Sequence, residues 1–273
     1  MNVPKSATVA SLLTLAMAGA LPLAAQAQSA DAWKWNATIY GWFPALGGTT
    51  SFPATGTGPS IDVSSSQVID ALKMVFMGSL EAKKGRWGGF TDLVYADFGA
   101  DKSGSRDFTI DHGQIPVGVD ANLSLDIKST IWTLAGEYSL ADKPEGNADL
   151  LFGARMLDMK ESLAWSINGT IPGLPPAARS GNATVSDTYW DAVVGVKGRL
   201  RLGSEGKWFV PFYVDVGTGQ SQLTWQGVAG VGYQFSWGSV IGAWRYMDYN
   251  FKSGQSVQSL NLNGGAIGVQ FGF

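Results

Sequence analysis

The chain of 273 residues contains a single histidine, His112, and no cysteine. His112 stands in the stretch DFTIDHGQIP, close to Asp107 and Asp111. Proton transfer near neutral pH is most often carried out by histidine, so this Asp–His pair is a candidate hydrolase site for lipid or peptide substrates. The residues that follow, Gly113 and Gln114, supply no hydroxyl nucleophile. A solvated histidine in a loop is the simpler interpretation, and we do not expect an enzyme.

Metal and cofactor chemistry has little support in the sequence. The lone histidine lacks the spaced histidine or cysteine partners of a metal site. The glycine-rich stretch PATGTGPS neither follows a strand nor opens a helix, so it indicates no phosphate-binding loop. We therefore expect no cofactor. A net charge of −3 and a pI near 5.1 give no reason to expect nucleic acid as a partner.

Charged residues recur on one side of apolar, alternating segments. In ALKMVFMGSLEA (71–82), an extended strand places the apolar side chains on one face and the charged ones on the other, whereas a helix would mix them. The charged positions found in this way are Lys73, Glu81, Asp92, Glu137, Arg155, Asp191, Lys197, Arg199, Asp215 and Arg245. Because both signs occur in near balance, we predict a salt-bridged network facing a common interior.

Alternation of this kind marks ten segments. The expected strands are 33–43, 71–82, 87–98, 129–140, 149–159, 187–202, 208–217, 223–235, 239–251 and 259–273. Short links at 83–86, 141–148, 203–207 and 237–238 alternate with three long ones at 44–69, 99–121 and 160–186 and two modest ones at 218–222 and 252–258. Eight strands stay open if the hairpins of 208–251 are misread, and twelve would need strands within the long links.

The last segment, GAIGVQFGF (265–273), indicates why such a sheet should close. Ile267, Val269, Phe271 and Phe273 share one face up to the final residue, whereas most chain ends are frayed and polar. In hydrocarbon each unpaired N–H or C=O costs several kcal/mol, and pairing the first strand with the last removes both sheet edges. We therefore predict an all-β fold: a closed antiparallel transmembrane β-barrel of ten strands.

The first 27 residues read as a secretory signal peptide. Lys5 is followed by an apolar run and by an A-x-A exit at Ala25–Ala27, and we expect cleavage between Ala27 and Gln28. A permanent transmembrane helix anchor is the alternative, against which Pro22 and the A-x-A exit argue. The expected barrel domain is therefore 28–273.

Composition and link lengths indicate the compartment. Glycine (36 residues) and tryptophan (11) are abundant, and charged residues make up 15% of the chain, below the roughly 25% of soluble domains. Alternating apolar strands in an exported chain are typical of barrels in the outer membrane of Gram-negative bacteria. Such barrels have short periplasmic turns and longer outer loops, which would place both termini in the periplasm.

The sequence resembles a group of largely uncharacterised proteobacterial outer-membrane barrel proteins. The stretches that carry the resemblance are GRWGGFTDLVYADFG, WDAVVGVKGRL, YVDVGTGQSQLTWQGVAGVGYQFSWGSVIGAWRYMDYNF and GAIGVQFGF. The likeness implies that the terminal strand, with Phe271 and Phe273, is an assembly signal read by the barrel-assembly machinery. Omptin proteases also have ten strands, but their His with an Asp two residues earlier is missing, since Ile110 occupies that position before His112.

These observations predict a small, monomeric outer-membrane barrel with a salt-bridged polar lumen and a structural, envelope or surface-interaction role. Outer-membrane lipid and lipopolysaccharide are its expected surroundings. A lumen of ten strands is narrow, between filled eight-stranded barrels and open porins. A narrow passive channel for small solutes is therefore the first alternative, and a hydrolase acting through His112 is the second.

Overall fold

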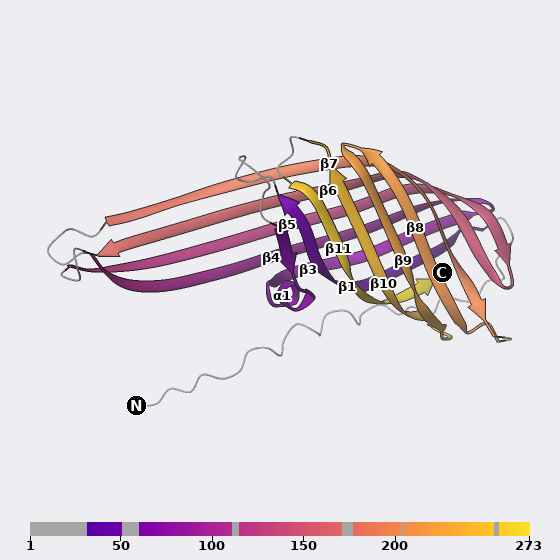
Figure 1. The fold of residues 1–273 in the computed structure, drawn as a ribbon. Helices are drawn as coiled ribbons and strands as arrows, with labels where there is room; N and C mark the ends of the chain where they lie inside the picture. Colours follow the sequence, from indigo (N-terminus) through magenta and orange to yellow (C-terminus); the bar gives the residue numbers. More distant parts are fainter. Residues whose placement is uncertain (1–31, 51–59, 111–114, 171–176, 204, 254–256) are drawn as a thin grey trace, which may run out of the picture.

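A computed structural model describes residues 32–50, 60–110, 115–170, 177–203, 205–253 and 257–273. Nearly all of them belong to strands (Figure 1). The elements are β1 (Lys34–Thr50), β2 (Ser60–Val63), α1 (Ser65–Asp70), β3 (Leu72–Lys84), β4 (Trp87–Ile110), β5 (Ile115–Lys143), β6 (Gly146–Thr170), β7 (Ala177–Leu202), β8 (Trp208–Gly219), β9 (Ser221–Gln234), β10 (Ser239–Phe251) and β11 (Val257–Gly272).

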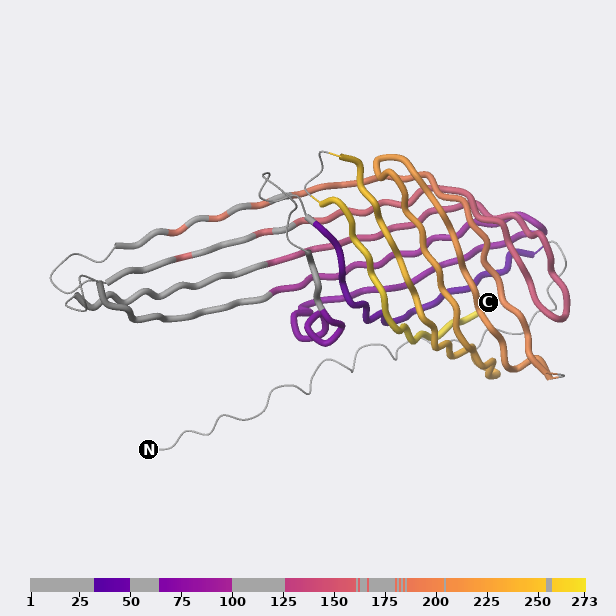
Figure 2. The backbone as a smooth tube through the Cα atoms, in the orientation of Figure 1, coloured from indigo at the N-terminus to yellow at the C-terminus, as the bar shows by residue number. Residues whose placement is uncertain are grey.

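The strands form one antiparallel sheet that closes on itself. Consecutive strands from β3 to β11 are paired, and β1 lies between β3 and β11. The closing ladder of β1 with β11 runs from Asn36↔Gly272 to Thr50↔Val257, and Figure 2 shows the first and last strands side by side. The last strand is therefore paired on both sides and has no free edge. The prediction of a closed barrel of ten antiparallel strands is confirmed.

Strand β2 and helix α1 lie outside this count of ten and fall in the segment 44–69, which the sequence predicted to be a link. β2 pairs with residues 46–49 of β1. In α1, the Ser64 side chain accepts from the Gln67 N–H while the Gln67 side chain accepts from the Ser64 N–H, a capping box that fixes the helix start. No helix among the described residues is long and apolar enough to cross a membrane.

The predicted long links at 99–121 and 160–186 are also mostly strand, so that prediction was wrong. The β4–β5 ladder runs to Ile110↔Ile115 and the β6–β7 ladder to Gly169↔Ala177. Residues 99–110, 115–126, 162–170 and 177–184 form a four-stranded extension, the projecting sheet, that runs beyond the barrel (Figure 1). Two of its strands do carry the period of two that marks strands with one apolar face: Val117, Val119, Leu123 and Leu125 alternate with polar or small residues in one, and Leu163, Trp165 and Ile167 in the other.

Large apolar side chains cover the outward face of the barrel. On β8, for example, Trp208, Val214 and Val216 are each about half exposed, while the alternate positions Phe209 and Asp215 are buried. At the end that carries the short turns, here the turn end, aromatic rings follow one another around the rim. Their centroids lie 4.7–5.9 Å apart along Trp208, Tyr233, Phe235, Trp237 and Phe271.

The inward side chains of β3–β7 form rows of residues that are paired from strand to strand. Neighbouring rows differ in polarity. One row is Ser79, Asp92, Thr133, Arg155 and Asp191. The next row, away from the turn end, is Met77, Val94, Ile131, Leu157 and Tyr189. A step of two residues along every strand keeps the inward face and moves to the next row, so the interior separates into polar and apolar layers.

Candidate functional site

The centre of the barrel interior holds Arg155 of β6, which has no exposed side-chain surface. Its guanidinium forms an ion pair with Asp215 of β8 and donates to Thr133 Oγ1 (3.3 Å) and Thr224 Oγ1 (3.4 Å). Asp215 also accepts from the Tyr213 hydroxyl. Strands β5, β6, β8 and β9 thus meet at one guanidinium. This arrangement ties opposite parts of the wall together through the lumen.

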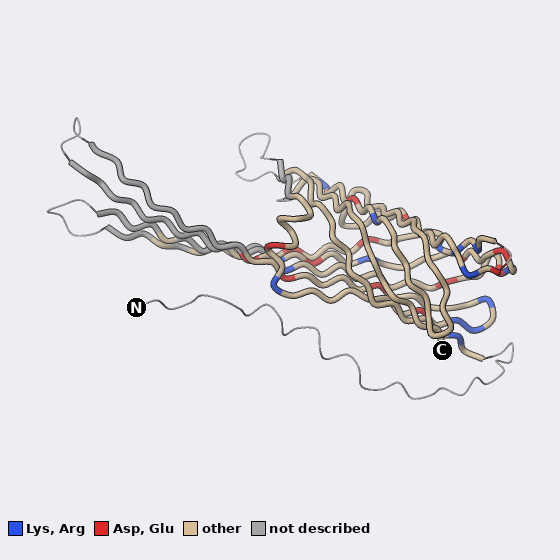
Figure 3. The backbone as a smooth tube through the Cα atoms, turned by 90° about the horizontal axis from the view of Figure 1, so that it is seen from below, with Lys and Arg blue, Asp and Glu red and all other residues tan. Residues whose placement is uncertain are grey.

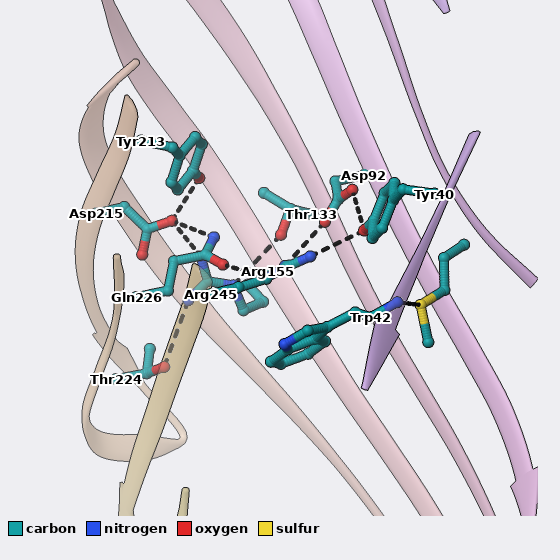
Figure 4. Close-up of polar contacts among 11 residues, drawn as sticks. Tyr40, Trp42, Asp92, Thr133, Arg155, Tyr213, Asp215, Thr224, Gln226 and Arg245 are labelled. Atoms are coloured by element: carbon teal, nitrogen blue, oxygen red, sulfur yellow. Dashed lines mark hydrogen bonds and ion pairs between the residues drawn. The ribbon is translucent and has the colours of Figure 1, made fainter. Parts of the chain in front are cut away.

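A second arginine, Arg245 of β10, extends this cluster to the other side (Figure 4). Gln226 joins the two arginines, because its amide nitrogen donates to Asp215 (2.8 Å) and its oxygen accepts from Arg245 Nε (3.1 Å). Arg245 also donates to Tyr40 Oη (2.8 Å) and Asp92 Oδ2 (2.9 Å), and Tyr40 donates to Asp92 (2.6 Å). We call these contacts the arginine network, with Arg155 and Asp215 included.

Closer to the turn end, Lys197 of β7 bridges two carboxylates. It pairs with Glu81 of β3 and with Glu137 of β5, the latter at 2.6 Å. Its ammonium also lies 4.3 Å from the centre of the Phe90 ring. Nearby, Lys83 pairs with the fully buried Asp149. These contacts, the lysine network, form a second charged layer across β3–β7.

Both networks are built so that no arginine or lysine in them is left without a carboxylate. Taking an unpaired charge out of water is expensive, and the charges here are paired, with further hydrogen bonds to Arg155, Arg245 and Asp149. In a buried polar cluster, each neighbour that is satisfied also orients the next one. The arrangement connects the strands across the lumen, and the guanidinium of Arg245 donates to Gln226, Tyr40 and Asp92.

An apolar layer adjoins the arginine network on the side away from the turns. It is made of Trp42, Met77, Val94, Ile131, Leu157, Tyr189, Met247, Tyr249, Phe251, Val257 and Leu262. Each of these residues is at most 9% exposed, and Met247 and Tyr249 are not exposed at all. Trp42 lies over Arg245, with 4.8 Å from the guanidinium carbon to the ring centre, so the polar and apolar layers are in direct contact.

Two of the predicted interior residues lie inside without an ion pair among the described residues. Arg199 donates to Gln270 and stacks over Phe209, with 4.6 Å from its guanidinium carbon to the ring centre. Asp191 accepts from the Ser221 N–H at 2.7 Å. Both therefore fasten neighbouring or opposite strands through hydrogen bonds.

Lys73 does not belong to the interior, and this part of the prediction was wrong. The β3–β4 register shifts between Leu72 and Met74, so Lys73 is an extra residue at a bulge. Its side chain is half exposed and pairs with Asp126 beyond the apolar layer. Lys128 pairs with Asp97 close by (3.4 Å), and Figure 3 shows charged positions gathered where the projecting sheet leaves the barrel. We call these two pairs the rim cluster.

The predicted assembly signal lies at the turn end. The Phe273 N–H donates to the Trp35 carbonyl (3.0 Å), and the two rings stack with centroids 6.5 Å apart. The Phe271 ring is 5.9 Å from that of Trp237. The expected cleavage site at Ala27 and Gln28, the candidate residue His112 and its neighbour Asp111 lie outside the described residues.

Sequence reasoning missed the apolar layer and the uncharged members of the arginine network. Tyr40, Gln226 and Tyr249 are on inward positions by alternation, but charge was the criterion for choosing interior residues. The apolar layer could have been found by comparing successive inward positions along each strand. On five consecutive strands, the residue two positions beyond Ser79 or its row partners is apolar or aromatic.

Comparison with known proteins gave likenesses in structure only, since no family model and no curated protein matches the sequence. The outer-membrane protease OmpT from Escherichia coli aligns with 89% of this chain and 97% of its own, at 9% identity and a TM-score of 0.45. The translocator domain of the autotransporter NalP from Neisseria meningitidis aligns with 88% of both chains, at 14% identity and a TM-score of 0.35. The attachment invasion locus protein Ail of Yersinia pestis aligns with 89% of this chain and 99% of its own, at 8% identity and a TM-score of 0.31.

Proposed function

We propose that this chain is a small outer-membrane barrel with a closed lumen, whose role is structural or in surface interaction through the projecting sheet. The observation that carries the proposal is the apolar layer that lies across the interior next to the arginine network. A water-filled path would have to pass Met247 and Tyr249, which have no exposed surface. A narrow solute channel is the alternative.

The outward face supports a membrane location. The exposed outward residues of β8, β10 and β11 include Val214, Trp244 and Ile267 at 52–59% exposure, a pattern that is unfavourable in water and natural in hydrocarbon. The aromatic rim at the turn end fits the interface between hydrocarbon and water, where tryptophan and tyrosine are enriched. Short turns at that end would face the periplasm, and the projecting sheet would then extend from the cell.

With this proposed placement we expect three partners. Lipid would cover the outward apolar face, and lipopolysaccharide would surround the rim cluster in the outer leaflet. The C-terminal strand, with Phe271 and Phe273, would be read by the barrel-assembly machinery after export by the signal peptide. Deleting Phe273 should therefore lower the amount of folded barrel in the outer membrane, measured by heat-modifiable gel migration of membrane fractions. Unchanged assembly would contradict this role.

A cysteine-labelling experiment tests the closed lumen, since the natural chain has no cysteine. Leu157→Cys and Met247→Cys would be placed in lipid vesicles and exposed to a charged, membrane-impermeant thiol reagent on both sides. We expect no modification at either position, and rapid modification of the control Lys84→Cys at the exposed end of β3, next to the turn. Modification of Leu157→Cys at a rate near that of the control would overturn the closed lumen.

An epitope inserted between Ile110 and Ile115 tests the surface role, because these residues form the end of the β4–β5 ladder. The proposal expects antibody binding to intact cells. Binding only after the outer membrane has been permeabilised would place the projecting sheet on the periplasmic side and end the surface-interaction proposal. A matched epitope at Gly85 should show the opposite behaviour.

A further inference from the structure

Within the described part of the barrel wall, the neighbouring strands β1 and β3 part along a stretch of several residues. The β1–β3 ladder runs from Lys34↔Lys83 only to Ile39↔Gly78. Both strands continue, since β1 stays paired with β11 as far as Thr50 and β3 stays paired with β4 as far as Leu72. Residues 40–45 of β1 and 72–77 of β3 therefore face each other without a ladder. We call this gap the β1–β3 seam.

The sequence of β1 suits an unpaired edge at this position. The Trp42 N–H points to β3 and donates to the Met77 sulfur at 3.1 Å instead of to a carbonyl. Pro44 is two residues further on the same edge and has no N–H to leave unpaired. From Leu46 onward, β2 takes over the pairing. The seam therefore avoids much of the energetic penalty that an open strand edge has in hydrocarbon.

The outer side of the seam is apolar. Phe43 on β1 and Met74 and Phe76 on β3 are 42%, 59% and 51% exposed. Helix α1 packs against β1 beside it, with Val68 buried. Lys73 of the rim cluster is next to Met74, at the end of the seam away from the turns. A small apolar molecule dissolved in the bilayer could thus approach the seam over Phe43 and Phe76, on the turn-end side of Lys73.

The inner side of the seam adjoins a cavity of about 190 Å³. Tyr40 of β1 and Ser79 of β3 lie next to the point where the β1–β3 ladder ends, and both line the cavity. On β11, which neighbours β1, and on β10 its wall is made of the small side chains Ala266 and Ala243 and of Gly268, the register partner of Tyr40. Bulky residues fill the β3–β7 side of the interior, and small ones on β10 and β11 leave this space open.

The chemistry of the lining favours an apolar occupant. Besides the hydroxyls of Thr38 and Ser79, the lining contains polar groups that belong to the arginine network, namely Tyr40, Asp92, Tyr213, Gln226 and Arg245. Their donors are directed at one another or at Asp215 within the arginine network (Figure 4). A water molecule needs two to four polar partners to occupy a cavity, whereas apolar cavities near this size stay dry and bind benzene or xenon.

We propose that this cavity binds a small apolar molecule of about the size of a single aromatic ring, which enters from the bilayer through the β1–β3 seam. The cavity holds the ligand by shape and apolar contact, and the apolar layer above it prevents passage along the barrel axis. Met77 lies at the seam and acts as its gate, because its sulfur accepts the Trp42 N–H and its side chain is buried. This activity goes beyond the proposed surface role and does not depend on it.

Crystals of the protein under xenon pressure test the cavity. We expect a xenon peak beside Ala243 and Ala266, and loss of that peak in Ala243→Leu, which fills the space. The matched control is Ala229→Leu on the neighbouring strand β9, an outward and exposed position, which should keep the peak. Ordered water with no xenon in the wild-type cavity would overturn the proposal, as would a peak that persists in Ala243→Leu.

Ligand exchange tests the seam separately. Fluorobenzene exchange would be followed by fluorine NMR on the protein in lipid nanodiscs, where the lipid is the reservoir. Met77→Ala should speed exchange several-fold. Val94→Ala is the matched control, because Val94 is the register partner of Met77 on β4 and belongs to the same apolar layer, but not to the seam. Equal acceleration in both variants, or in neither, would show that the ligand does not enter at the seam.

Discussion

The arginine network and the rim cluster use the same residue types in opposite surroundings. Arg155 and Asp215 have side chains 0% and 1% exposed, whereas the side chains of Lys73 and Asp126 are 50% and 42% exposed. Exposed pairs contribute about 0–1 kcal/mol, and removal of one partner of a buried pair costs about 3–5 kcal/mol. The difference shows that burial, and not the presence of an ion pair, decides which charges hold this barrel together.

The networks also differ in their connections. Asp215 is held by Arg155, Tyr213 and Gln226 at once, so it links strands β6, β8 and β9. Each pair of the rim cluster joins neighbouring or next-neighbouring strands on the outer surface only. Loss of an interior residue should therefore affect the whole barrel, and loss of a rim residue only its surroundings.

The largest effect should follow from Arg155→Met, which leaves Asp215 buried without its cation. We expect the free energy of unfolding to fall by about 3–5 kcal/mol, measured by reversible urea unfolding in lipid vesicles. Replacing both partners, in Arg155→Met with Asp215→Leu, should restore part of the loss, because it removes the unpaired charge. If Arg155→Met alone were as stable as the wild type, the buried pair would contribute no more than the exposed pairs of the rim cluster.

A smaller but comparable effect is expected for Leu157→Ala in the apolar layer. The substitution removes packed atoms and leaves a cavity, at about 2–5 kcal/mol. Its control is Leu134→Ala, an outward position that is 52% exposed to the surroundings of the barrel. The same urea titration should give a clearly smaller change for the control. Equal losses at the two positions would mean that the interior is not packed as a core.

The smallest effect is expected for Lys128→Ala, which breaks the exposed pair with Asp97. The change should be about 0–1 kcal/mol. Since exposed charges are screened by salt, the difference from the wild type should shrink further when unfolding is repeated at high ionic strength. A loss as large as that of Arg155→Met would show that the rim cluster is a structural element of the same weight as the arginine network.

The alternation of the sequence was enough to predict the barrel. Strands such as β8 and β10 carry a strict period of two, and the final strand keeps its apolar face to Phe273, so a closed sheet was the arrangement that paired every edge. The projecting sheet was missed, although two of its four strands carry the same alternation. Residues 115–126 and 162–168 alternate apolar and polar side chains as the barrel strands do, whereas 99–107 and 177–184 have no such apolar face and are held by ladders that continue from the barrel.

The sequence predicted which residues face the interior, but not which of them pair with one another. Alternation placed Arg155, Asp215 and Arg245 on the inward side, where the structure has them. Which carboxylate meets which cation depends on how the strands are staggered around the barrel, and a sequence does not give that stagger. Lys73 shows a second limit, because the bulge at its position removes it from the alternation on which the prediction rested.

Single-channel recording in planar lipid bilayers tests the central claim, a lumen closed by its own side chains, most directly. We predict that the purified, heat-modifiable barrel inserts without discrete conductance steps, and that Tyr249→Gly combined with Leu157→Gly, which opens the apolar layer, produces them. Reproducible steps from the wild-type protein that change in size when Arg245 or Asp215 is substituted would contradict the claim and establish the lumen as a path for solutes.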